Sequence, residues 1–507
     1  MNDSVAARER ASVLLDRGPV DLLVIGGGIV GAGIARDAAL RGMRALLVEQ
    51  GDFASGTSSR SSRLLHGGLR YLAQGRIGLV REASVEKMRL SRNAPHLCQP
   101  LPFVFPVWKD ADWPLWQLAI GVRFYGLLCG GNNLGSSSSH LAKRLSGMVP
   151  GLMQQGLSGG VRYFDALTND ARLVIETLRS ARAAGAAVLN YTPFVSGSRS
   201  GEGWTCVVLD QLGGSQTEVR ARAVANATGA WAPRLQHSRV HLRLTKGVHL
   251  VIDRSRLPVN EAIVLPEGER ILFAIPWGER VILGTTDTDY EGDPAAARTD
   301  QSDIRYVLDL VNGRFPQARL TPDCVLASWA GVRPLVSPRR RKPGSPSDVS
   351  RRHEIRMAEP GWFDVTGGKL TTYRLIAEQA VDRIGRFLRM HLPPSPTARL
   401  PLTAGPYSGV LPPPIEPAVV RECCRQEWAA HLDDVLLRRT SWHFYHSNQL
   451  GTATVAARWM ADELGWSREQ TAQELERYCE AAEFNPLATP GAGAQGGRKA
   501  CAPSSTV

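Results

Sequence analysis

A glycine-rich turn near the N-terminus constrains the fold of this chain more than any other feature. A short apolar run, VDLLVI at 20–25, leads into Gly26, Gly28 and Gly31, which are spaced as G-x-G-x-x-G. An alanine-rich helical pattern, IVGAGIARDAAL at 29–40, follows at once. In this order the first glycine permits a tight turn, the second lets the backbone approach a pyrophosphate, and the third lets the helix pack closely on the strand. Because the helix N-terminus also presents unpaired N–H groups to phosphates, the pattern predicts a βαβ unit that binds a dinucleotide.

An acidic residue stands where such a unit binds a ribose. A second apolar run at 44–48 ends at Glu49, whose carboxylate can accept hydrogen bonds from ribose hydroxyls. The same negative charge repels a 2′-phosphate, so FAD and NAD remain as candidate cofactors. A run of small hydroxyl residues, SGTSSRSSR at 55–63, follows. This run suits the lining of an extended cofactor, although taken alone it is equally typical of a flexible loop.

The remaining pattern indicates an α/β protein with a second sheet. The 507 residues imply two or three domains. Helical and buried-strand patterns alternate in the first part of the chain. From 248 to 285, several short apolar runs lie between proline and glycine turns, which predicts an antiparallel sheet distinct from the βαβ part. Beyond the proline-rich linker at 411–414 the chain is expected to be helical, and the Gly/Ala/Ser tail after about residue 485 is expected to be disordered.

The charge balance favours anionic partners. The formal net charge is +12, which attracts phosphorylated metabolites, anionic lipid or nucleic acid. No basic motif interleaved with aromatic residues occurs, so nucleic acid is not expected as a partner. The eight cysteines form no C-x-x-C pair and no metal-ligand spacing, which predicts reduced thiols in the cytoplasm and no metal site. The N-terminal residues 1–19 lack the apolar core of a secretory signal.

One segment allows two interpretations with respect to membranes. No uncharged apolar run is long enough to span a bilayer. Residues 113–130 come nearest, with Arg123 in the middle and Trp113, Trp116 and Tyr125 around it. They form either a partly buried helix or a helix that lies on a membrane surface.

Seven segments, in order along the chain, resemble the FAD-dependent glycerol-3-phosphate dehydrogenases of the aerobic type, within the DAO-like flavoprotein superfamily. The segments are TSS at 57–59 through LHGGLRYL at 65–72, NATGAW at 226–231, KGVH at 246–249, IPW at 275–277, GTTDTD at 284–289, GVRPL at 331–335 and GGKLTTYR at 367–374. The resemblance implies an α/β fold class: a Rossmann-type FAD-binding domain with an inserted antiparallel β-sheet substrate domain and a short helical C-terminal region.

The resemblance divides the chain into parts. The expected parts are 20–98, 157–245 and 328–395 for the FAD-binding domain, 99–156 for a cap that includes the candidate membrane-facing helix, 246–327 for the antiparallel substrate-binding sheet, 415–484 for the helical C-terminal region and 485–507 for a disordered tail.

The function implied is oxidation of sn-glycerol 3-phosphate to dihydroxyacetone phosphate by hydride transfer to bound FAD. Electrons then pass to quinone, or to oxygen as in the oxidase branch of the family. The family resemblance also implies a peripheral position on the inner face of the cytoplasmic membrane, with a homodimer as the candidate assembly. The alternative is an FAD-dependent oxidase of another small hydroxy or amino acid in the same superfamily, whose substrate carboxylate would use the same arginines.

The family's functional positions map onto three sets of residues. The catalytic set is His249, Arg333 and Lys369, and the substrate-binding set is Arg70, Tyr71 and Arg351. The FAD-binding set is Gly26, Gly28, Gly31, Glu49, Thr57, Ser58, Ser62, Leu64, Gly367, Gly368, Leu370 and Thr371.

Elementary chemistry agrees with these roles. Removing a hydride from a secondary alcohol requires a base for the hydroxyl proton, and the neutral imidazole of His249 suits that task. A cation such as Lys369 stabilises the negative charge that develops on a flavin. Guanidinium groups bind a phosphate dianion in a bidentate manner.

Two departures from the family pattern stand out. The family's Ser-Arg-Asp-His reads SRRH at 350–353 here, with Arg352 in place of an acid. The helical region between about 400 and 436 is also shorter than in the family's long members. The first departure puts the exact substrate in question, and the second puts the oligomeric state and the electron acceptor in question.

Overall fold

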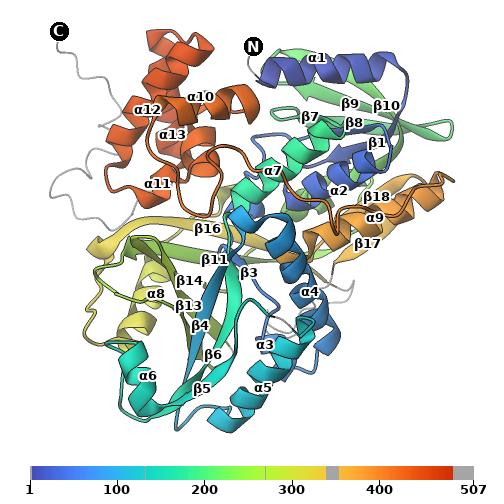
Figure 1. The fold of residues 1–507 in the computed structure, drawn as a ribbon. Helices are drawn as coiled ribbons and strands as arrows, with labels where there is room; N and C mark the ends of the chain where they lie inside the picture. Colours follow the sequence, from blue (N-terminus) through green and yellow to red (C-terminus); the bar gives the residue numbers. More distant parts are fainter. Residues whose placement is uncertain (1–2, 132, 269, 338–352, 483–507) are drawn as a thin grey trace, which may run out of the picture.

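Two β-sheets and a C-terminal group of helices organise the structure (Figure 1). The computed structural model describes residues 3–131, 133–268, 270–337 and 353–482. In the view of Figure 1 the first sheet lies at the upper right, the second at the lower left, and the C-terminal helices, in orange and red, at the upper left. The α/β fold class expected from the sequence is confirmed.

The first sheet is mostly parallel and contains the glycine-rich turn. Its order is β17-β18-β10-β1-β2-β7, and all neighbouring pairs are parallel except β17 with β18. The strands are β1 (Val20–Ile25), β2 (Ala45–Val48), β7 (Ala187–Leu189), β10 (Ser215–Asn226), β18 (Trp362–Thr366) and β17 (Glu354–Glu359), with β8 (Phe194–Ser200) and β9 (Gly203–Asp210) extending the free part of β10. Helices α2 (Ile29–Leu40), α7 (Asp170–Ala183) and α9 (Tyr373–Phe387) accompany this sheet. The central strands β1 and β2 are largely apolar and buried, as is usual where helices and loops cover both faces of a parallel sheet.

The second sheet is largely antiparallel and longer than expected. Its order is β15-β11-β14-β13-β12-β4-β6-β3, with β16 paired to β11 and β5 paired to β6. The strands are β3 (Leu64–Leu65), β4 (Gln99–Trp108), β5 (Ser138–Leu141), β6 (Leu157–Leu167), β11 (Leu242–Asp253), β12 (Ala262–Glu267), β13 (Arg270–Trp277), β14 (Arg280–Gly284), β15 (Thr288–Asp289) and β16 (Val325–Val336). Helices α3 (Arg70–Ala73), α4 (Ile77–Asn93), α5 (Leu115–Leu128), α6 (Ala142–Met148) and α8 (Gln301–Arg314) surround it.

Strands β4 and β6 of this sheet come from outside the range 246–327 that was expected to form it. We expected 99–156 to form a cap and 157–245 to belong to the FAD-binding domain, yet β4 pairs with β6 and joins the second sheet through β12. Pro100, Pro102 and Pro106 obscure β4 in the sequence, because proline is rare inside sheets. β6 shows no clean alternation, because both of its faces are largely buried. Strands β11 and β16 likewise run past the expected limits at 246 and 327.

Three further elements complete the part of the fold around the first sheet. Strand β10 runs without a break from Ser215 to Asn226. A short 3-10 turn, Leu370–Thr372, leads directly into α9. The N-terminal residues form α1 (Asp3–Asp16), which packs near β7 and α10.

The C-terminal helices share a hydrophobic core with the second sheet. They are α10 (Pro417–Gln426), a π-helical turn (Asp434–Arg439), α11 (Trp442–Tyr445), α12 (Gln449–Leu464) and α13 (Arg468–Ala481). Trp442 and Phe444 belong to the same buried cluster as Trp277 and Trp329 of the second sheet. Buried ion pairs tie the same helices to the first sheet: Arg172 of α7 binds Glu427 with N–O distances of 2.6 and 2.7 Å. The C-terminal region is therefore packed against both sheets, and the tail at 485–507 lies outside the described residues.

Within the described ranges, none of the helices combines the length and the apolar character that crossing a bilayer requires. Cys98, Cys129, Cys206, Cys324, Cys423 and Cys424 carry free thiols.

Candidate active site

A cavity of about 1040 Å³ lies where the two sheets meet. One part of its wall comes from the carboxyl ends of β1, β2, β10 and β18, the usual ligand position in open α/β sheets. The opposite part comes from β16, the 55–64 segment and the loop at 366–371. A third, apolar part comes from α3, α5, β12 and β13. The cavity therefore has a dinucleotide end, a polar centre and an apolar arm.

The glycines at the dinucleotide end are required by close contacts. Gly26 has a φ of +109°, and a Cβ there would lie 2.7 Å from the carbonyl oxygen of Ala227. A Cβ on Gly31 would overlap the carbonyl oxygen of Gly26, and one on Gly28 would lie 3.2 Å from Ser58 Oγ. These positions keep the backbone of the β1–α2 turn open to the cavity.

Polar groups from the hydroxyl-rich segment complete this end. Ser58 Oγ accepts a hydrogen bond of 3.0 Å from the backbone N–H of Ile29, at the start of α2. Thr57 Oγ1 donates a hydrogen bond of 2.6 Å to the carbonyl of Val332, which fixes the segment against β16. Glu49 accepts hydrogen bonds from the N–H groups of Gly27 (2.6 Å) and Gly51 (3.0 Å). Burial raises the pKa of the Glu49 carboxyl, although these backbone donors oppose the shift.

These features fit the cofactor that the sequence predicts. The glycine cradle leaves the space that a pyrophosphate occupies, the N-terminus of α2 faces the same space, and Glu49 borders it at the end of β2. Leu64, in β3, and Thr371 continue the wall toward the polar centre. Tight backbone contacts, a helix terminus and an acid at these positions are suited to the adenosine and diphosphate part of FAD.

Two loops that are distant in the sequence meet at the polar centre. Gly367 (φ +73°) and Gly368 (φ +85°) form a turn, and a Cβ on Gly368 would overlap Ile376. Lys369 follows; its Nζ donates a hydrogen bond of 3.3 Å to the carbonyl of Gly67 and lies 4.4 Å from the centre of the Tyr71 ring. The hydroxyl of Thr371 accepts a hydrogen bond of 3.1 Å from the N–H of His66. The 66–71 and 367–371 loops are thereby held together, and residues of both line the cavity.

Arg333 is fixed by groups from a neighbouring strand end. It donates hydrogen bonds to Asp287 Oδ1 (3.1 Å), Thr285 Oγ1 (2.7 Å) and the carbonyl of Thr286 (3.2 Å). Gly247 lies opposite on β11, and a Cβ there would overlap the guanidinium. A side chain at 247 would displace Arg333, so the glycine of the KGVH segment serves the position of this arginine. Arg333 lines the cavity.

His249 does not occupy the position expected for a base. It lies on β11 with only 1% of its surface exposed, and it is absent from the cavity wall. Its Nε2 forms a hydrogen bond of 2.8 Å with Ser62 Oγ, and Ser62 is the partner that faces the cavity. Burial, together with the charges of Arg333 and Arg63, holds the pKa of His249 well below its ordinary value of 6.5.

The structure brings together most of the residues in the three expected sets. Tyr71 is buried and lines the cavity beside Lys369, and Gly367, Gly368 and Leu370 line it too. Arg70 begins α3, but its side chain is not described. Arg351 lies outside the described residues, as do Arg352 and the basic cluster at 339–342.

Three cavity residues stand outside the three expected sets. His66 is half-buried and, among the residues that the structure describes, is the one histidine in the cavity wall. Thr285 and Asp287 hold Arg333. All three stand inside segments that carry the family resemblance, LHGGLRYL and GTTDTD. The motifs therefore mark the segments that contain these residues, but the sequence does not indicate which of their side chains face the cavity.

A cavity that joins a dinucleotide-binding turn to a cluster of His, Lys and Arg defines an oxidoreductase of the dinucleotide-dependent class. Residues 21–383 match the family of FAD dependent oxidoreductases, DAO, and residues 412–471 match the C-terminal domain of alpha-glycerophosphate oxidase. The chain belongs to this family of FAD-dependent oxidoreductases.

Similar proteins share most of this chain. Glycerol-3-phosphate dehydrogenase 2 of Mycobacterium tuberculosis is 40% identical over 389 residues, which is 75% of this chain and 66% of the relative. Aerobic glycerol-3-phosphate dehydrogenase of Staphylococcus aureus is 36% identical over 419 residues, 80% of this chain and 75% of the relative. The crystal structure of glycerol-3-phosphate dehydrogenase from Bacillus halodurans in complex with FAD is 30% identical, with a TM-score of 0.75, and the match covers 94% of this chain and 98% of that one. The chain thus spans slightly less than two thirds of the mycobacterial relative's length.

Proposed function

We propose that this protein oxidises glycerol 3-phosphate to dihydroxyacetone phosphate with bound FAD. The observation that carries the proposal is that Arg333, His66 and Lys369 line the same cavity as the dinucleotide-binding turn. The substrate needs a phosphate site, a proton acceptor and a hydride acceptor within one small space. The names of the relatives support the same substrate.

Arg333 is suited to hold the phosphate. Its guanidinium is planar and permanently charged, and such a group binds phosphate oxygens through parallel N–H donors. Asp287 and Thr285 fix its orientation, so little side-chain freedom is lost when the substrate binds. The side chains of Arg333 and Asp287 are only 21% and 16% exposed, so water screens the guanidinium less than it screens a fully exposed arginine, while Asp287 offsets part of its charge.

His66 is suited to take the proton of the substrate hydroxyl. It lines the cavity, whereas His249 lies behind Ser62. A neutral imidazole has a proton affinity that suits a general base near neutral pH. Thr371 fixes the backbone of His66 from the facing loop. Bound FAD supplies the acceptor for the hydride that leaves the carbon atom.

Lys369 contributes a positive charge at the same place. Its ammonium is held between the carbonyl of Gly67 and the face of Tyr71. A fixed cation at the polar centre stabilises negative charge that develops during hydride transfer, because it needs no reorganisation at that moment. The same charge adds to the attraction for the substrate phosphate.

Anaerobic titration tests this function. The purified holoenzyme is mixed with glycerol 3-phosphate, glycerol, glycine or lactate in separate experiments, and the absorption of oxidised flavin is followed. Only glycerol 3-phosphate is expected to bleach the flavin, because glycerol lacks the phosphate that Arg333 binds. Bleaching by an amino acid or hydroxy acid, without bleaching by glycerol 3-phosphate, would instead support the alternative oxidase activity.

We further propose that the apolar arm of the cavity opens toward an anionic membrane surface and admits a quinone as the electron acceptor. Trp116 and Leu127 of α5 are each 67% exposed, and Ile120 and Phe124 are exposed between them on the same side of the helix. Trp113, Ile120 and Phe124 also line the cavity. The apolar arm and the exposed apolar face of α5 are therefore continuous.

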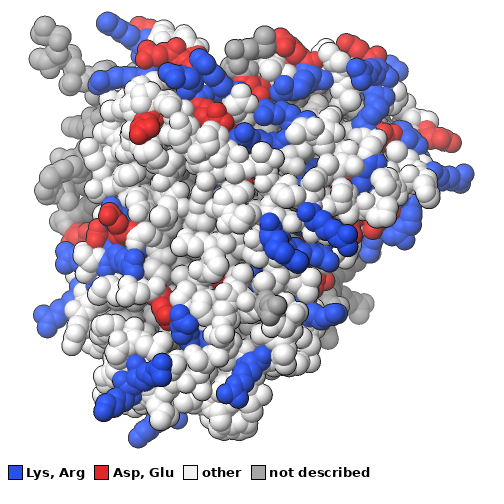
Figure 2. Space-filling model, in the orientation of Figure 1, with Lys and Arg blue, Asp and Glu red and all other residues white. Residues whose placement is uncertain are grey.

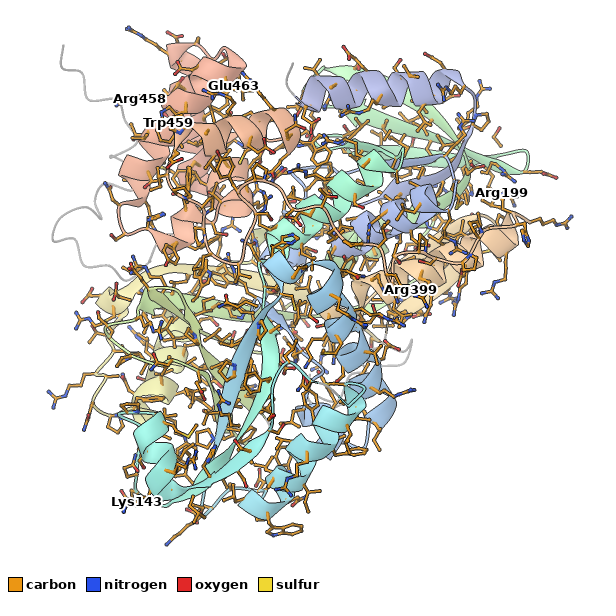
Figure 3. The ribbon with its side chains drawn as sticks, viewed as in Figure 1. Lys143, Arg199, Arg399, Arg458, Trp459 and Glu463 are labelled. Carbon is orange, nitrogen blue, oxygen red and sulfur yellow. The ribbon has the colours of Figure 1, made fainter. Side chains whose placement is uncertain are left out.

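The charge near α5 supports an anionic surface as the partner. Lys143 and Arg144 lie on α6, and Figure 2 shows Lys and Arg side chains, without Asp or Glu, over the lowest part of the face in view. Lys143 extends away from the body of the protein at this lower end (Figure 3). Apolar side chains next to basic ones are typical of helices that lie in the headgroup region of a bilayer.

Vesicle sedimentation tests the membrane proposal. Vesicles of phosphatidylglycerol and phosphatidylcholine are expected to bind the protein less as salt rises, because salt screens charges within about 8–10 Å. Ile120→Ser is expected to weaken binding several-fold, about 1–2 kcal/mol for one exposed apolar side chain. Val195→Ser, at a valine of similar exposure on β8 (54% against 59% for Ile120), is the matched control. Equal binding by both variants, or no binding to anionic vesicles, would contradict the proposal.

A further inference from the structure

Ser62 and His249 form a hydrogen-bonded pair in which only the serine reaches the cavity. The Ser62 Oγ and His249 Nε2 atoms are 2.8 Å apart. Ser62 is half-buried and lines the cavity, whereas His249 is fully buried on β11 behind it. The contact joins two segments that approach the cavity from different elements. Any effect of His249 on a bound molecule must therefore pass through Ser62.

The imidazole of His249 is held in one orientation. Its ring stacks on Trp329 of the neighbouring strand β16, with 5.2 Å between ring centres and 18° between planes. Trp329 is itself fixed, because its indole N–H donates a hydrogen bond of 3.1 Å to the carbonyl of Ser61. On the other side, Gly284 leaves room for the ring, since a Cβ there would lie 2.5 Å from His249 Cδ2. The ring therefore has little freedom to turn.

The partners of the ring decide which nitrogen carries the proton. Within the described residues, Nδ1 of His249 is buried and has no hydrogen-bond partner. The ring is neutral, because burial and the nearby Arg333 and Arg63 lower its pKa well below 6.5. A proton on Nδ1 would be a buried donor without an acceptor, which is rare and costly. A proton on Nε2 is paired with Ser62 Oγ and leaves only a lone pair on Nδ1.

We propose that His249 is a positioning residue: its Nε2–H donates to Ser62 Oγ and so directs the Ser62 hydroxyl hydrogen into the cavity, toward an acceptor atom of the bound flavin. A hydroxyl has one hydrogen to donate, and the His249 N–H occupies one of its acceptor sites. The hydrogen of Ser62 is then left for the cavity side. This inference rests on the proposed function only through the binding of FAD. It removes His249 from the role of base that the sequence led us to expect.

Nuclear magnetic resonance of the ring nitrogens tests the first half of this inference. The holoenzyme is labelled with ¹⁵N-histidine, and the His249 signals are identified by their loss in His249→Gln. Nε2 is expected to be protonated and Nδ1 unprotonated, with no change between pH 6 and 9. The charged groups near the ring are Arg333, paired with Asp287, and Arg63, which interacts with Asp170. A protonated Nδ1 in this range would overturn the proposal.

The midpoint potential of the bound flavin, measured without substrate, tests the second half. Ser62→Ala removes the donor and is expected to lower the equilibrium constant for two-electron reduction about tenfold, or ~30 mV. His249→Leu is expected to cause a similar change, and Ser62→Ala with His249→Leu no more than either alone. His249→Gln, whose amide N–H can still donate to Ser62, is expected to restore most of the potential.

A second serine provides the control. Ser58→Ala removes the contact with the N–H of Ile29 at the start of α2 and is expected to weaken FAD affinity without changing the potential. Unchanged potentials in Ser62→Ala, or equal changes in His249→Gln and His249→Leu, would overturn the proposal. Since neither measurement uses glycerol 3-phosphate, failure here is separate from failure of the proposed substrate. If His249→Leu does not fold, the nitrogen assignment in the unaltered protein still decides the question.

Discussion

The dinucleotide end and the polar centre of the cavity are built in opposite ways. The dinucleotide end comes from β1, α2 and β2, which are contiguous in the sequence, and it uses mostly backbone: glycines, N–H groups and one acid. The polar centre takes one or two side chains from each of several distant segments, among them Ser62 and His66, Arg333 and Lys369. Local backbone geometry thus creates the cofactor site, and long-range packing creates the chemistry.

This difference implies that cofactor binding and turnover can be separated by mutation. A side-chain change at the polar centre should leave the cradle of glycines intact, because in the described part of the chain the side-chain hydrogen bonds to the β1–α2 turn come from Glu49 and Ser58. A change in the cradle should remove the cofactor before it affects any catalytic side chain. A variant at the dinucleotide end or at the polar centre that lowers both FAD binding and turnover of the FAD-loaded enzyme would contradict this separation.

The largest effect is expected at His66. His66→Gln keeps a polar side chain of similar size but cannot take a proton, so flavin reduction by glycerol 3-phosphate should slow by roughly 10²–10⁴-fold. The FAD content should stay that of the unaltered protein. Rapid-mixing spectroscopy measures the rate. His249→Gln is the matched control and should slow the reaction less than about tenfold, the value of one hydrogen bond. The reverse ranking of the two histidines would restore His249 as the base.

The second largest effect is expected at Arg333, and it concerns substrate binding. Arg333→Ala removes a guanidinium–phosphate contact of about 2–4 kcal/mol, which corresponds to a rise of roughly 30- to 1000-fold in the apparent substrate constant. Arg243→Ala, on the same sheet and paired with Asp289 outside the cavity, should change it less than about threefold. Steady-state kinetics on both variants, with FAD content checked, gives the comparison. Similar losses in both would show that overall positive charge, and not the fixed position of Arg333, attracts the substrate.

A change in the glycine cradle should instead weaken FAD binding and leave substrate binding nearly unchanged. In Gly31→Ala the new Cβ would overlap the carbonyl of Gly26, and relieving such overpacking costs about 1–3 kcal/mol. FAD affinity should fall roughly 10- to 100-fold, while the substrate constant of reconstituted enzyme stays near normal. Gly313→Ala, where a Cβ meets open space on α8, is the control and should bind FAD normally. Unchanged FAD affinity in Gly31→Ala would show that the turn does not depend on this contact.

The same difference explains what could be predicted from the sequence. The β1–α2–β2 unit was confirmed almost residue by residue, because its strands, glycines and helix are set by neighbouring residues. The expectation that His249 reaches the substrate rested on a motif, and a motif identifies a strand without saying which face of the sheet a side chain occupies. The direction of the His249 side chain depends on its stacking on Trp329 and on the space that Gly284 of β14 leaves for the ring. Neither residue is near His249 in the sequence. Strand β4 was missed for a related reason. Its prolines disfavour a strand locally, but pairing with β6 and β12, which are distant in the sequence, places it in the sheet.

The smallest expected effect concerns the support behind the dinucleotide end, at Asp52. This carboxylate lies three residues after Glu49, is 2% exposed, and receives two hydrogen bonds of 2.7 Å from Arg439 and another from Arg438, both in the C-terminal helical region. Burial alone would raise its pKa, but Arg439 and Arg438 outweigh burial and lower it from 3.8 to about 2. The resulting stabilisation is full above pH 3.8, where the unfolded carboxyl is ionised, and is lost as the pH falls through about 2. Its size is about 2 kcal/mol, at 1.36 kcal/mol for each unit of pKa.

Urea unfolding at a series of pH values measures this contribution. Asp52→Asn keeps the shape of the side chain without its charge, so the variant should be less stable than the unaltered protein near pH 6. The difference between the two should shrink by about 2 kcal/mol as the pH falls toward 2. Asp110→Asn, at an exposed aspartate, controls for the loss of one surface charge. A difference that stays constant with pH would show that Arg438 and Arg439 do not hold the carboxylate in its charged form. The C-terminal helices would then support the dinucleotide end through packing alone, and the two ends of the cavity would be more alike than their contacts indicate.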